Sequence, residues 1–215
     1  MQNEELAVLD FFSKEENLPL ALSVAEQVDG IRQNMNNAFW RALHGSIRRF
    51  LESHRLPWVV EMTEDRNTPD SFVGLHLQPM SEQEQYLRLM IEQQYMGETL
   101  RIYYGVMWNT APSADKARLA EVTALREALQ DKGFKNNESF LAWNWTIYHP
   151  RRRDFLQRYS TSANALLDEV SELLSQLLLE HGSELNAANA ALREAPLSVT
   201  VSLDQLRANI TKSFG

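Results

Sequence analysis

Apolar and polar side chains alternate in four short runs between Trp58 and Met107. Strict alternation predicts a strand with one buried face. Four such runs separated by short turn segments predict an antiparallel meander. Only the third run has a rival interpretation, because Ser81 and Glu84 also resemble a capping box that would open a helix. The apolar positions are Trp58, Val60 and Met62, then Val73, Leu75 and Leu77, then Leu87, Leu89 and Ile91, then Leu100, Ile102, Tyr104 and Val106.

The segment before the alternating runs has apolar residues at helical spacing. From Ile31 to Leu51 apolar residues recur at the spacing of one helix face, which predicts a long helix over residues 31–54. Leu18 and Leu22 indicate a first, shorter helix, and Gly30 is expected to separate the two.

The second half of the chain is mainly helical in pattern. Helices are predicted over 113–131 and 162–180, ended by Gly133 and Gly182. The aromatic segment 137–159 fits no single element, because Pro150 interrupts it. Beyond it the pattern indicates a helical piece at 185–192, a strand at 197–201 and a short helix opened by Asp204.

These elements predict an α+β fold, an antiparallel β-meander flanked by long helices with a helical C-terminal half. The 31–54 helix is expected to cover one face of the sheet, and the later helices to complete the core. Residues 1–110 form the helix and meander region, and residues 111–215 form a mainly helical region that packs on it as one compact unit.

Composition limits the class of protein. The 215 residues include 44% hydrophobic residues and no cysteine, which excludes disulfides and thiolate metal sites and fits a reducing cytoplasm. No apolar run approaches the roughly 20 residues that cross a bilayer, and the N-terminal region is acidic rather than a basic leader. We therefore expect a cytoplasmic protein with no membrane association.

The net charge of −8 is unevenly spread. Residues 1–110 hold 16 Asp or Glu against 9 Lys or Arg, whereas residues 132–158 hold six Lys or Arg against two acidic residues. Basic and aromatic side chains together can hold phosphates and stack bases, so this segment is the predicted binding surface. The alternative is that its aromatics fill the core and its arginines pair with carboxylates. The candidate residues are Arg151, Arg152, Arg153, Trp143, Trp145, Tyr148, Lys132 and Lys135.

No catalytic constellation is evident. The acidic cluster Glu61, Glu64, Asp65 and Asp70 could hold magnesium for phosphodiester hydrolysis. None of the five lysines has an acidic residue two positions before it, so the acidic-x-Lys element of many metal-dependent nucleases is absent. We interpret the cluster as a solvated turn, and we predict no metal site, no cofactor and no catalytic residue.

One match to the residue spacing of an enzyme class remains as an alternative. Arg49 and His54 have the Arg-x4-His spacing of helical RNases, in which histidine acts as a general base and arginine stabilises the phosphate. With this many arginines such a spacing is expected by chance, and the neighbouring meander argues against an all-helical RNase.

The pattern in the first half resembles the region that follows the nuclease core in bacterial PD-(D/E)XK superfamily proteins associated with phage defence. The resemblance covers about half of the chain and consists of apolar and aromatic positions. The acidic and lysine residues that define the superfamily have no counterparts. The matching segments are Leu9 to Phe12, Val28 and Ile31, Phe39, Trp40 and Leu43, and Arg101 to Val106.

The resemblance implies a non-catalytic accessory or recognition module of a defence-type assembly that binds a partner protein. Contact with nucleic acid and formation of a homo-oligomer are both open alternatives. An acidic inhibitor or decoy is the alternative from another class. In that case the carboxylates of the first half would occupy the basic surface of a nucleic-acid enzyme, and a phage could encode such a protein.

Overall fold

The computed structural model describes residues 2–68, 70–97, 99–109 and 116–195. Within them one five-stranded antiparallel sheet runs in the order β1-β2-β3-β4-β5. The strands are β1 (Trp58–Glu64), β2 (Phe72–Pro79), β3 (Leu87–Met96), β4 (Thr99–Trp108) and β5 (Phe140–Trp145). The helices are α1 (Gln2–Phe12), α2 (Leu18–Ser53), the short 3-10 helix η1 (Lys116–Arg118), α3 (Ala120–Asp131) and α4 (Arg153–Glu194). The predicted α+β meander with flanking long helices is confirmed.

The strand register explains why the alternating runs form one buried face. Val60 of β1 lies opposite Leu77 of β2, and Leu89 of β3 lies opposite Val106 of β4. Because side chains alternate across a strand, these pairs point to the same side of the sheet. The third run is a strand, and the competing prediction of a helix there is wrong.

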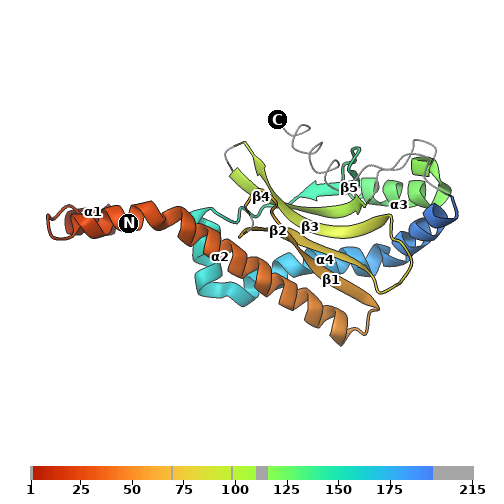
Figure 1. Cartoon of the computed structure of the whole chain (residues 1–215), viewed down its shortest axis with the longest axis horizontal. Coiled ribbons are helices and arrows are strands. Elements are labelled where there is room, and N and C mark those ends of the chain that lie inside the picture. Colours follow the sequence, from red (N-terminus) through yellow and green to blue (C-terminus); the bar gives the residue numbers. More distant parts are fainter. Residues whose placement is uncertain (1, 69, 98, 110–115, 196–215) are drawn as a thin grey trace.

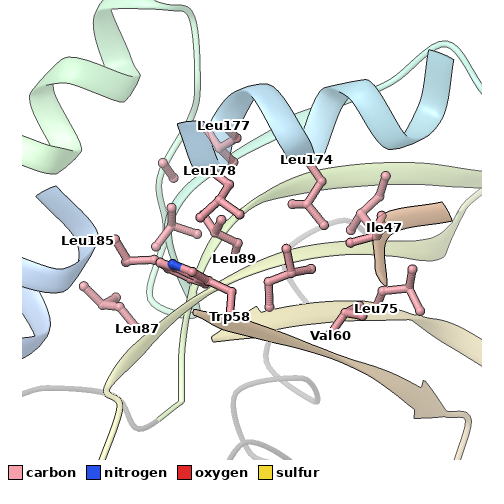
Figure 2. Packing of buried hydrophobic residues seen from close by; sticks show 14 of the residues in the cluster. Ile47, Trp58, Val60, Leu75, Leu87, Leu89, Leu174, Leu177, Leu178 and Leu185 are labelled. Atoms are coloured by element: carbon pink, nitrogen blue, oxygen red, sulfur yellow. The ribbon is translucent and has the colours of Figure 1, made fainter. Parts of the chain in front are cut away.

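Helices cover that face of the sheet (Figure 1). α2 contacts β1 and β2, α4 contacts β3 and β4, and the two helices contact each other. Figure 2 shows Ile47 of α2, Leu75 of β2 and Leu174 of α4 among the side chains of this core, and all three are fully buried. Burial of such side chains is the main stabilising term for the fold, at about 1.5–3 kcal/mol for each.

Buried polar contacts tie the helices to the sheet. The Asn189 side chain on α4 accepts hydrogen bonds from the backbone N–H groups of Tyr86 and Leu87, both at 2.8 Å. Its amide nitrogen donates to the Leu87 carbonyl at 2.9 Å. On α2, Trp40 Nε1 donates to Gln93 Oε1 on β3 at 2.9 Å. These contacts fix the register of both long helices against β3.

Two predicted helix ends are wrong. α2 passes through Gly30 and α4 passes through Gly182 without a break. A helical glycine costs only about 1 kcal/mol relative to alanine, so tertiary packing can override it. At position 182 a Cβ would lie 3.0 Å from Leu178 Cδ1 of the same helix and at an ordinary contact distance of 3.6 Å from Trp58 Cζ2, so the tight contact there is with a side chain one turn earlier in α4. The only non-helical residue inside α4 is Ser162 (φ −146°, ψ 46°).

Other boundaries follow the sequence more closely. α3 ends at Asp131, and Gly133 follows with φ +85°, as expected of a helix stop. The predicted N-terminal caps of this helix, Ser113 and Asp115, lie outside the described residues. So do the strand predicted at 197–201 and the helix predicted from Asp204.

The two halves of α2 differ in their surroundings. Its second half buries Phe39, Trp40, Leu43, Ile47 and Leu51 against the sheet and α4. No residue in 3–32 is buried, and the first buried side chain is that of Asn36. We call residues 2–32 the arm and the remaining described residues the body. Figure 1 shows the arm extending well beyond the sheet.

Candidate binding surfaces

Part of the predicted basic and aromatic surface lies on the face of the sheet opposite α2 and α4. There Trp143 is only 5% exposed and packs against Trp145, with ring centroids 5.6 Å apart. Lys135 Nζ lies 5.7 Å from the Trp143 ring centroid, within the range of a cation–π contact. Phe140, Tyr103 and two methionines complete a second apolar cluster. Trp143 is therefore largely packed, as the core alternative had it.

A second group gathers near the turn between β3 and β4. The Arg101 guanidinium lies 5.4 Å from the Trp145 ring centroid, and its Nε donates to the Thr146 carbonyl at 2.6 Å. Arg151 Nη1 donates to the Tyr95 hydroxyl at 3.0 Å. Tyr95 pairs with Leu100 in the ladder, so both cations lie at the same end of the sheet. Neither Arg101 nor Tyr95 was among the predicted binding residues.

Three of the remaining candidates, Lys132, Arg152 and Tyr148, contact carboxylates of α4. Lys132 pairs with Glu180, and Arg152 Nε lies 3.4 Å from Asp154 Oδ1. The Tyr148 hydroxyl donates to Glu169 at 3.1 Å. Arg158 pairs with the same carboxylate, and its hydrogen bond, followed by that of Tyr148, lowers the pKa of Glu169. The eight predicted residues therefore do not converge on one site. Trp143, Trp145 and Lys135 pack together and Arg151 contacts Tyr95. Lys132, Arg152 and Tyr148 contact three different carboxylates, and Arg153 is exposed.

Of the acidic cluster, the Asp65 side chain supports the turn between β1 and β2. The Asp65 carboxylate accepts hydrogen bonds from the Asn67 backbone at 2.9 Å and from the Thr68 hydroxyl at 2.5 Å. Glu61 lies apart, on β1, and contacts His76 Nε2 at 2.8 Å. Within the described ranges, no three His, Asp or Glu side chains are close enough to share a metal ion.

His76 belongs to a polar row on the sheet face opposite the helices. Its neutral ring satisfies both neighbours, because Nε2–H donates to Glu61 and Nδ1 accepts from the Thr63 hydroxyl at 3.1 Å. Burial, followed by the charge of Arg88, lowers the pKa of His76. The alternation of residues 61, 63 and 76 with apolar positions was the sequence pattern that could have revealed this row.

Arg49 and His54 do not converge on one site. Arg49 lines a shallow groove of about 560 Å³ between α2 and α4, together with Asp168 and Glu172. His54 does not line this groove, and its Nδ1 lies 3.0 Å from the Phe50 carbonyl at the end of α2. This arrangement gives no support to an RNase site.

The most conspicuous surface is the arm. The described residues contain 13 exposed large hydrophobic side chains, and nine of them lie within residues 6–31. The sequence predicts a helix around Leu18 and Leu22, but the pattern does not show whether its apolar side is covered. The nine are Leu6, Val8, Leu9, Phe11, Leu18, Leu20, Leu22, Val24 and Ile31, each between 44% and 62% exposed.

The chain matches no known protein family model, no curated protein and no solved structure. The resemblance to the region after a PD-(D/E)XK nuclease core therefore stays a prediction. In the part of the chain that the structure describes, no helix is both long and apolar enough to cross a membrane.

Proposed function

We propose that this protein is a non-catalytic binding module that docks a partner protein through its arm. The observation that carries the proposal is the concentration of nine exposed apolar side chains on 26 residues that project from a packed body. Monomeric proteins rarely expose contiguous apolar patches larger than a few hundred Å², and larger ones mark interaction sites. The resemblance described above supports a defence-type assembly in the bacterial cytoplasm as the setting.

A pull-down from native cell extract tests this function. The bait is the full chain, compared with the variant Leu20→Gln/Val24→Gln/Ile31→Gln, which makes one flank of the arm polar while keeping good helix formers. The matched control is Met80→Gln/Ile147→Gln/Leu179→Gln, which removes three exposed apolar side chains of the body. Loss of the same captured protein with the arm variant alone supports the proposal. Equal capture by all three baits contradicts it.

Contact with nucleic acid at the start of α4 is a second candidate. Arg152 and Arg153 are exposed there. Cations at a helix N-terminus oppose the macrodipole, so these arginines do not stabilise the helix on which they lie. Arg151 and Arg101 add positive charge at this end of the sheet, and the exposed Tyr95 offers an aromatic face for stacking.

The variant Arg151→Ala/Arg152→Ala/Arg153→Ala tests the second candidate. Retention on single-stranded DNA or RNA should fall and lose its salt dependence, while the free energy of unfolding changes by about 0–1 kcal/mol. Arg48→Ala/Arg49→Ala/Arg55→Ala removes the same charge from exposed positions around the end of α2 and serves as the control. Equal retention by both variants would rule out the α4 site.

A further inference from the structure

The arm exposes more apolar surface than its two helices cover for each other. α1 contacts α2, yet every residue of 3–32 is exposed except four that are half covered, Phe12, Asn17, Ala21 and Val28. At 3.6 residues per turn, Ala21 and Val28 mark one strip of α2. Exposed apolar residues lie on both flanks of this strip: Leu20, Val24 and Ile31 on one, and Leu18 and Leu22 on the other. The contact between α1 and α2 thus leaves apolar side chains exposed on both sides of this strip.

We propose that the occupant of this surface is a second copy of the chain, and that two arms pack about a twofold axis as a four-helix bundle. This inference rests on the proposed function, because it names the partner of the same arm. A twofold interface needs a patch that complements itself, and an exposed apolar flank on an antiparallel pair of helices can pack against its own copy in this way.

The size of the surface fits a stable dimer. At the observed exposures the nine side chains leave on the order of 900 Å² of accessible surface on each copy, on both flanks of α2 and around α1, so a dimer that buries the standard area of about 800 Å² per partner has to enclose most of the arm. The body offers nothing comparable among its described residues, since its four exposed large hydrophobics, Met80, Tyr95, Ile147 and Leu179, are scattered over different elements.

The charge of the arm predicts opposite salt dependences for binding a second copy and for binding a basic partner. The arm holds seven Asp or Glu against Lys14 and Arg32, so two arms repel each other at low salt. Salt screens this repulsion and leaves apolar burial intact, so self-association should tighten as ionic strength rises. An acidic decoy on a basic enzyme surface would weaken under the same change.

Sedimentation velocity and equilibrium of the full chain test the proposal between about 1 and 100 μM, in 50 mM and 500 mM NaCl. The wild type should form a dimer whose dissociation constant falls at least threefold in the higher salt. The Leu20→Gln/Val24→Gln/Ile31→Gln variant should raise the dissociation constant at least 100-fold. The body control Met80→Gln/Ile147→Gln/Leu179→Gln should leave it within threefold. Far-UV circular dichroism confirms that both variants are folded.

Three results would overturn the second copy as occupant: a wild type that is monomeric at 100 μM in 500 mM NaCl, a dimer that survives the arm substitutions, and a dimer that weakens with salt. The pull-down then separates the two proposals. A monomeric wild type whose arm variant loses a captured protein rejects the dimer and keeps the binding function. A monomeric wild type with capture that does not depend on the arm rejects both.

Discussion

One continuous helix, α2, passes through two opposite environments. Its second half places Phe39, Trp40 and Ile47 in the core at 0% exposure. Its first half leaves Leu20 and Leu22 more than half exposed. Both halves have apolar residues at helical spacing, so the difference lies in what surrounds each half. The comparison shows that an amphipathic pattern predicts a helix but does not identify what covers its apolar side.

The difference has consequences for local stability. The body combines a buried core with polar contacts such as that of Asn189, whereas the arm has few buried contacts to hold its backbone hydrogen bonds. Regions of that kind open locally at a small fraction of the global free energy of unfolding. Changes in the body should therefore affect global unfolding, and changes in the arm should affect local order and association.

Gly105→Ala should have the largest effect. A Cβ at this position would lie 2.1 Å from the Ala142 carbonyl oxygen and 2.8 Å from Trp143 Cα, so β4 and β5 would have to separate. We expect a loss of about 3 kcal/mol or more in the free energy of unfolding, measured by urea denaturation. At Gly45 the nearest atom would be in a flexible arginine side chain at 3.5 Å, so Gly45→Ala should not destabilise. Equal stability of the two variants would contradict this packing of β5.

Asn189→Ala should have the next largest effect. It leaves the N–H groups of half-buried Tyr86 and buried Leu87 without the side-chain acceptor they now share. The expected loss is about 2–4 kcal/mol, because buried unpaired donors cost more than the hydrogen bond itself contributes. The control Asn186→Ala lies on an exposed position of the same helix and should change stability by less than about 0.5 kcal/mol. A neutral Asn189→Ala would show that α4 is not anchored to β3 in this way.

Acidification should destabilise the body. Burial lowers the pKa of His76 and of His181 from the ordinary value of 6.5 in the folded protein. Below pH 6.5 the unfolded chain binds protons that the folded chain does not, so stability falls as the pH drops from 6.5 toward the folded pKa values. Thermal unfolding between pH 7.5 and 5 measures this, with His76→Gln/His181→Gln as the comparison. A variant with the same pH profile as the wild type would contradict the assignment.

Gly30→Ala in the arm should have the smallest effect on global unfolding. A Cβ there meets only Gln27 Oε1 at 3.9 Å, and alanine raises helix stability by about 0.5–1 kcal/mol. If the arm opens independently of the body, amide hydrogen exchange in residues 18–35 should slow while the urea midpoint stays constant. A rise in the urea midpoint by the full propensity gain would show that arm and body unfold together.

The sequence was most informative where a periodic pattern was unbroken. The four alternating runs predicted β1 to β4. The fifth strand, β5, was not predicted, and its register explains why. The register shifts between Val106 and Met107, so Phe140 and Trp143 share a face although an odd number of positions separates them. A bulge of this kind breaks the period of two on which recognition of a strand depends.

The candidate site depended on information that is not local. Lys132 pairs with Glu180, 48 residues away, and Arg151 contacts Tyr95, 56 residues away. Neighbourhood in the sequence had grouped Lys132, Arg151 and Trp143 together, whereas in the fold each has a different partner: Glu180, Tyr95 and Trp145.

The sequence by itself determined the local periodicities, and hence the antiparallel meander, the long helices and the turn at Gly133, because each depends on residues a few positions apart. Only the tertiary structure decided that α2 and α4 continue through their glycines, that Trp143 is largely packed and that the apolar flanks of the arm stay exposed. Burial depends on contacts between distant segments, and a pattern along the chain does not contain them.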